Sequence, residues 1–115
     1  MRHRNTKRIL NRPADQRKAL VRNLITSLFL SGKVKTTDAK AKALQVSAEK
    51  LITKIKGKDK MNAIRELKKV IFTEESSRKA LEYAEKTEKV SGFTRLTKIG
   101  FRDGDNALLV QIELL

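Results

Sequence analysis

The sequence contains no cysteine, no tryptophan and only one histidine, His3, among its 115 residues. Without cysteine the chain cannot form disulfides, thiolate zinc sites or a cysteine nucleophile. A single histidine leaves no basis for a histidine metal site or a Ser-His catalytic pair. Aromatic residues make up only 4% of the chain, so the stacking platforms on which many single-strand binders hold bases are mostly missing. These absences argue against an enzyme, and we expect no cofactor and no small-molecule substrate.

Long hydrophobic runs are also absent. The most apolar stretch near the N-terminus, residues 24–30, has seven residues and includes Thr26 and Ser27, so it is too short to span a membrane. Arg22 and Asn23 interrupt any signal-peptide core. An organellar transit peptide would suit the Arg-rich start, and a membrane surface would suit a basic amphipathic first helix. Because that start runs straight into the first helix, whose apolar stripe the core needs, we expect no membrane partner.

Positive charge is what the sequence has in excess. It carries 27 Lys and Arg against 13 Asp and Glu, a formal net charge of +14 and a pI near 10.4. Residues 1–22 hold eight basic residues and one acid, Asp15. Before Arg12 there is little aliphatic surface besides Ile9 and Leu10, so this arm cannot build a core of its own. We expect it to stay extended and mobile until a polyanion orders it, and we infer that the polyanion is RNA, bound through its phosphates.

Hydrophobic periodicity predicts four helices and three short strands. Pro13 and Gly32 bracket the first helix, because proline suits a first turn and glycine a C-terminal stop. Thr73, followed by two glutamates, is a helix start. The predicted elements are a helix over 14–31, a strand over 33–37, helices from 38 to about 57, from 59 or 60 to 71 and from 73 to about 88, and strands over 93–99 and 107–114.

The order α-β-α-α-α-β-β predicts an α+β fold with two layers, in which helices cover one face of a small antiparallel or mixed sheet. We expect one domain over residues 1–115, with 1–12 as a basic extended arm and 13–115 as the globular body. The inner face of the third helix is predicted to contain Met61, Ile64, Leu67 and Ile71, with Lys68 at its edge.

The two C-terminal strands are joined by the turn sequence GFRDGDN, residues 100–106. Its acids superficially suggest a calcium loop, but the further ligands and the twelfth-position Glu of an EF-hand are missing, so a hairpin turn is favoured. Arg95, Lys98 and Arg102 lie on this hairpin. They either extend the RNA surface or are ordinary solvent-facing charges.

Three stretches resemble the bacterial large-subunit ribosomal protein seventeen family: MRHRNTKRILNRPADQRKALVRNLITSL, KTTDAKAKAL and GFTRLTKIGFRDGDNALLVQIEL. The resemblance covers nearly the whole chain in register, although residues 57–90 match only loosely. It implies a two-layer α+β domain in the cytoplasmic ribosome, bound to large-subunit ribosomal RNA near the exit of the nascent-peptide tunnel. It also implies that neighbouring large-subunit ribosomal proteins are partners.

The resemblance also implies which residues bind RNA. The basic start of the family maps onto Arg2, His3, Arg4, Lys7, Arg8, Asn11 and Arg12, and its first-helix Arg and Asn map onto Arg17, Arg22 and Asn23. Lys18 lies in the same basic stretch and is included. The alternative is a nucleoid-type DNA-binding protein, which would need a recognition helix or a wrapping arm and would usually dimerise.

Overall fold

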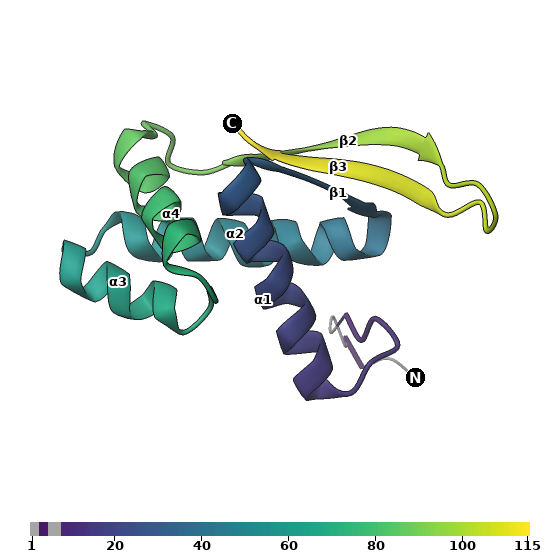
Figure 1. Cartoon of the computed structure of the whole chain (residues 1–115), viewed down its shortest axis with the longest axis horizontal. Coiled ribbons are helices and arrows are strands. Elements are labelled where there is room, and N and C mark those ends of the chain that lie inside the picture. The colour runs from purple at the N-terminus through teal and green to yellow at the C-terminus, as the bar shows by residue number, and fades with distance from the viewer. Residues whose placement is uncertain (1–2, 5–7) are drawn as a thin grey trace.

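The computed structural model describes residues 3–4 and 8–115 and contains the predicted series of helices and strands (Figure 1). In chain order the elements are α1 (Ala14–Ser31), β1 (Lys33–Thr37), α2 (Asp38–Lys56), α3 (Lys60–Lys68), α4 (Glu74–Lys86), β2 (Thr94–Phe101) and β3 (Leu108–Leu114). The predicted order α-β-α-α-α-β-β is confirmed.

The three strands form one sheet in the order β1-β3-β2, and both pairs are antiparallel. The C-terminal strand is therefore central, and its Ile112 pairs with Val34 on one side and Leu96 on the other. The helices lie on one side of this sheet, and α3 and α4 extend past one end of it (Figure 1). The predicted two-layer α+β architecture is confirmed.

The core lies between the sheet and the helices. Leu28 of α1, Leu44 and Ile52 of α2, and Ile112 of β3 are all fully buried. Burial of one such side chain contributes about 1.5 to 3 kcal/mol. Because α1 and α2 both place their apolar faces in this core, their other faces are left for solvent or for a partner.

The ends of α1 follow the predicted signals. Pro13 precedes the helix, and Gly32 ends it with φ 81°. That left-handed conformation lets the Gly32 N–H donate to the Leu28 carbonyl at 2.7 Å, and it favours glycine because a side chain would be strained there. The cap of α4 is also confirmed, because the Thr73 hydroxyl accepts the Ser76 N–H at 3.4 Å.

The prediction that the third helix continues to Ile71 is wrong, because α3 ends at Lys68. Contacts with α1 turn the chain at this point. Arg22 Nε donates to the Val70 carbonyl at 3.0 Å, and the Phe72 N–H donates to Thr26 Oγ1 at 3.2 Å. The Ile71 N–H still donates to the Leu67 carbonyl at 2.7 Å, but the Phe72 N–H bonds to α1 and not to the carbonyl four residues earlier.

The predicted inner face of α3 needs a second correction. Met61 is 64% exposed, whereas Ala63 and Leu67 are buried at 2% and 0%. A helix of nine residues presents about two turns to the core, and these two residues, spaced four apart, occupy that face. The fourth helix also ends slightly earlier than predicted, at Lys86 instead of about Glu88.

Candidate nucleic-acid interface

The first candidate residues lie in the N-terminal arm. Arg2 and Lys7 lie outside the described residues. His3 and Arg4 are exposed and have left-handed backbone conformations, with φ 46° and 57°. A left-handed pair of this kind makes a local bend, so these two residues are not part of a straight extended segment.

The base of the arm is folded against the body. The Arg12 N–H donates to the Ile9 carbonyl at 3.2 Å, and Leu10 and Asn11 are left-handed with φ 54° and 53°. Leu10 is half-buried, whereas Arg8 and Asn11 are exposed. The base of the arm is thus a turn over residues 9–12, followed by Pro13.

A hollow of about 410 Å³ lies beside this turn. We call it the arm hollow, and it is lined by Arg8, Leu10, Arg17, Val21, Ala43, Val46, Ser47 and Lys50. Arg12 is half-buried nearby in the chain, and its Nε has no hydrogen-bond partner among the described residues. The arm hollow therefore brings predicted cations of the arm and of α1 together.

On α1, Arg17 is half-buried, and Lys18 and Asn23 are exposed. Arg22 has partners within the protein. Besides donating to the Val70 carbonyl, it places its guanidinium carbon 4.0 Å from the centre of the Phe72 ring. Arg22 therefore holds the α3–α4 connection against α1, a role that the sequence did not predict.

A second hollow lies between α1, α2 and the end of α3, and we call it the α1–α2 groove. It encloses about 530 Å³. Its lining consists of six cations, one acid and five other residues: Arg17, Lys18, Arg22, Lys50, Lys54, Lys69, Glu66, Val21, Ile25, Ser47, Leu51 and Val70. Arg17, Val21, Ser47 and Lys50 also line the arm hollow, so the two hollows are continuous.

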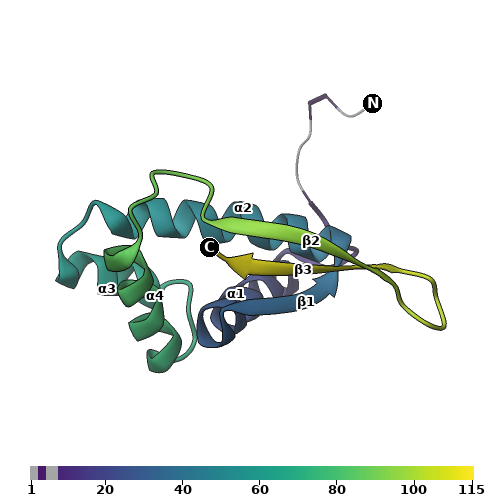
Figure 2. The same cartoon turned by 90° about the horizontal axis from the view of Figure 1, so that it is seen from above.

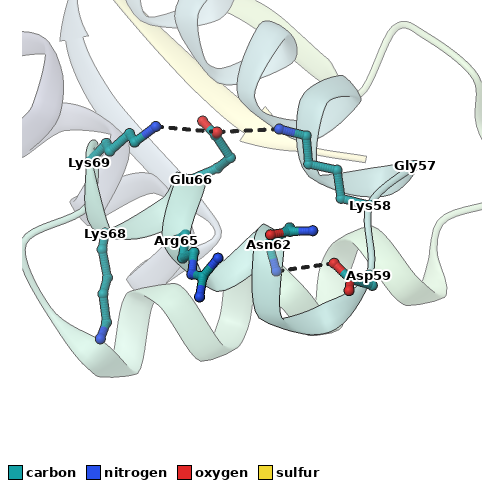
Figure 3. A pocket seen from close by; sticks show the side chains of 8 residues that line it. All are labelled: Gly57, Lys58, Asp59, Asn62, Arg65, Glu66, Lys68 and Lys69. Carbon is teal, nitrogen blue, oxygen red and sulfur yellow. Dashed lines mark hydrogen bonds and ion pairs between the residues drawn. The ribbon is translucent and has the colours of Figure 1, made fainter.

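Glu66 is the only acid among the described residues that line the α1–α2 groove, and three lysines surround it. Its carboxylate lies 2.9 Å from Lys54 Nζ, 3.3 Å from Lys58 Nζ and 3.4 Å from Lys69 Nζ. Figure 3 shows the carboxylate between the ammonium groups of Lys58 and Lys69. The hydrogen bonds from Lys54 and Lys58 lower the pKa of Glu66 from 4.5 to about 2, so the group is ionised at neutral pH.

The hairpin candidates lie apart from both hollows, since none of them lines either one. Arg95 forms an ion pair with Glu113 at 3.5 Å, and Arg102 Nε donates to Asp105 Oδ1 at 3.1 Å. The pairing with Arg102 lowers the pKa of Asp105 to about 2. Lys98 is exposed. The hairpin extends beyond the helices (Figure 2), so two of its three cations are partly neutralised at a separate part of the molecule.

The sequence analysis missed the groove residues contributed by α2 and α3. Lys50 and Lys54 are four residues apart and therefore lie on one face of α2. That spacing was visible in the sequence, but nothing in it indicated that this face lies opposite Lys18. Lys69 was not predictable in the same way, because its position depends on the early end of α3.

Other kinds of site find little support. No cluster of three or more metal-ligating side chains occurs within residues 3–4 and 8–115. None of the helices in the described part of the chain has both the length and the apolar character needed to cross a bilayer.

Comparison with known proteins gives a consistent match. A family model described as ribosomal protein L17 matches residues 20–115. Several proteins named large ribosomal subunit protein bL17 are similar to this chain over most of their length. The protein from Desulforapulum autotrophicum is 39% identical, covering 100% of this chain and 97% of the relative. The protein from Clostridium perfringens is 42% identical, covering 94% of this chain and 96% of the relative. The protein from Gemmatimonas aurantiaca is 41% identical, covering 100% of this chain and 98% of the relative.

Proposed function

The chain belongs to the ribosomal protein L17 family, and from this premise we propose that it binds large-subunit ribosomal RNA through its basic N-terminal arm and α1. A protein of this family is a structural component of the large ribosomal subunit and not an enzyme. To this family role the proposal adds the binding site and its ligand. The positions of the cations in the arm and α1 support both.

The observation that carries the proposal is the convergence of cations with few acids at the base of the arm. Arg8 and Arg17 line the arm hollow together with Lys50, and none of the described residues that line it is acidic. Cations without nearby carboxylates repel one another, and a phosphate backbone removes that repulsion and releases its counterions. We propose that this surface neutralises RNA strands that would otherwise repel each other.

The proposed RNA-binding residues have different roles. We propose phosphate contacts for Arg2, His3, Arg4, Lys7, Arg8, Asn11, Arg12, Arg17, Lys18 and Asn23. Arg22 contributes its positive charge while it also anchors the α3–α4 connection. For Arg95, Lys98 and Arg102 we propose contacts at a second place, reached by the projecting hairpin.

We further propose that residues 1–12 act as the arm and residues 13–115 as the body that carries it. The protein would then be found in the cytoplasmic ribosome, with other large-subunit proteins as neighbours. Helix α4 is available for them, because none of the proposed RNA contacts lies on it.

Sedimentation tests this function. Epitope-tagged protein in a cell lysate should co-sediment with large subunits on a sucrose gradient, and ribonuclease treatment should release it. A nucleoid-type DNA-binding protein would instead stay with chromatin after ribonuclease and leave it after deoxyribonuclease. That second pattern would contradict the proposed function.

A further inference from the structure

The α1–α2 groove is lined by many more cations than acids. Its six cations come from three separate parts of the chain: α1, α2 and the segment after α3. One acid, Glu66, accompanies them. Lys18 and Lys50 form no ion pair with any carboxylate of the described residues.

The spacing of these cations along α1 and α2 places like charges next to each other, which lowers the stability of each helix. Lys18 and Arg22 are four residues apart on α1, and Lys50 and Lys54 are four residues apart on α2. Like charges at this spacing destabilise a helix by a few tenths of a kcal/mol per pair. Two such pairs face one hollow. A bound polyanion would turn both repulsions into attractions.

Glu66 gives one wall of the groove a fixed arrangement. Its side chain is only 15% exposed, and it joins Lys54 of α2 to Lys69 beyond α3. Lys54 and Lys69 together exceed its single charge, so this wall of the groove remains positive. Because the lysine side chains are already held, less conformational entropy is lost when they meet a ligand.

The floor of the groove is apolar, formed by Val21, Ile25, Leu51 and Val70. An apolar floor under a cationic rim suits a polyanionic ligand in which charged groups alternate with less polar groups. In RNA the ribose and base can lie on the floor while the phosphates face the rim.

We propose that the α1–α2 groove binds a second stretch of the RNA sugar-phosphate backbone, distinct from the stretch bound by the arm, with Lys18 and Lys50 on its phosphates. This inference rests on the proposed function, because it takes ribosomal RNA as the polyanion. Continuity favours RNA over an acidic segment of a neighbouring protein: Arg17 and Lys50 line both the groove and the arm hollow, so a strand leaving the arm can continue into the groove.

The test uses the full-length protein and purified large-subunit ribosomal RNA, with affinity measured over a range of salt concentrations. The groove variant is Lys18→Gln with Lys50→Gln, and the arm variant is Arg4→Gln with Arg8→Gln. The matched control is Lys86→Gln with Lys89→Gln, which removes two exposed charges that line neither hollow. Thermal melts establish that each variant is folded.

We expect the groove variant to reduce the slope of log affinity against log salt by about 1.4 to 1.8, which corresponds to two phosphate contacts at 0.7 to 0.9 each. The control should leave the slope unchanged. Hydroxyl-radical footprinting should show that the groove variant loses protection at one set of nucleotides and keeps the set that the arm variant loses.

The outcomes separate this inference from the proposed function. If only the arm variant changes the slope and the footprint, the groove is not an RNA site and Lys18 makes no phosphate contact, while RNA binding through the arm stands. If the unaltered protein shows no salt-dependent binding to the RNA, the proposed function itself fails. If the groove variant binds RNA normally but loses a cross-link to an acidic segment of another protein in assembled subunits, the groove is a protein site and the inference is wrong.

Discussion

The guanidinium of Arg22 lies over the ring of Phe72, with its carbon 4.0 Å from the ring centre. The two residues are far apart in sequence, and Phe72 is 49% exposed. The Arg22 Nε also donates to the Val70 carbonyl at 3.0 Å. One arginine of the proposed RNA surface therefore also fixes the chain between α3 and α4. Its structural and RNA-binding roles can be separated by substitution.

Arg22→Lys keeps the charge but removes the planar group that makes both contacts. We expect it to lower the free energy of unfolding by about 1 to 2 kcal/mol, the sum of one hydrogen bond and one partly exposed cation–π contact. Urea denaturation measures this difference. Arg17→Lys is the control, because the Arg17 side chain forms no hydrogen bond with the described residues. Equal stability of the two variants would contradict the anchoring role.

The carboxylate of Glu66 should make the stability of the protein depend on pH. Its pKa in the folded protein is about 2, below the ordinary value of 4.5. A lowered pKa means that the ionised group stabilises the fold above about pH 4.5, and that this contribution is lost as the pH falls toward 2. We therefore expect Glu66→Gln to lower the melting temperature at pH 7 and to have a progressively smaller effect between pH 4.5 and pH 2.

Glu82→Gln is the matched control for this measurement, because Glu82 is exposed on α4 and pairs with no lysine or arginine of the described residues. Its melting temperature should follow that of the unaltered protein at every pH. If the difference between Glu66→Gln and the unaltered protein stayed constant down to pH 2, the three lysines would not be responsible for it.

Local sequence signals predicted most of the fold. Pro13 and Gly32 fixed the ends of α1 because each residue has a strong backbone preference at such a position. The alternation in residues 107–114 predicted β3, and its buried Val110 and Ile112 are the core of the sheet. These features depend on neighbouring residues, which a single sequence displays directly.

Contacts between distant residues could not be predicted in this way. The buried Ser76 hydroxyl donates to the Thr26 carbonyl at 2.9 Å across 50 residues, and neither residue belongs to an apolar pattern. The early end of α3 has the same origin, because Val70 is held by Arg22. The α1–α2 groove was missed for this reason as well: its cations were visible in the sequence, but their meeting required the packing of three elements.

The Ser76 contact leads to a prediction about how α4 is attached to α1. Ser76 is fully buried, and its hydroxyl also accepts a hydrogen bond from Thr73 Oγ1 at 2.9 Å. Ser76→Ala should lower the free energy of unfolding by about 1 to 2 kcal/mol, because two hydrogen bonds at a buried position are lost. Chemical denaturation measures this change.

Ser77→Ala is the control, since the Ser77 hydroxyl bonds only to the Thr73 carbonyl in an exposed setting, at 3.2 Å. We expect its effect to stay within about 0.5 kcal/mol, as is usual for surface substitutions. If Ser76→Ala were equally mild, the contact between α4 and α1 would depend on apolar packing alone.

Removal of residues 1–12 tests the division into arm and body. The core residues Leu28, Leu44 and Ile112 all lie outside the deleted segment, so the truncated chain should still unfold cooperatively. Among the described residues of the arm, Leu10 and Arg12 are half-buried and the others are exposed, so we expect a modest fall in melting temperature. Binding to large-subunit ribosomal RNA should weaken strongly, with a smaller salt dependence, because seven of the proposed cationic or polar contacts with phosphate are lost.

Circular dichroism and the same salt titration measure the two effects on one preparation. A truncated chain that has lost its cooperative melt would show that the turn over residues 9–12 is part of the folding unit, and the boundary at Pro13 would have to move toward the N-terminus. A truncated chain that melts normally and binds RNA with unchanged salt dependence would contradict the role of the arm. Binding that falls only partway would be explained by phosphate contacts of the α1–α2 groove, which the truncation leaves in place.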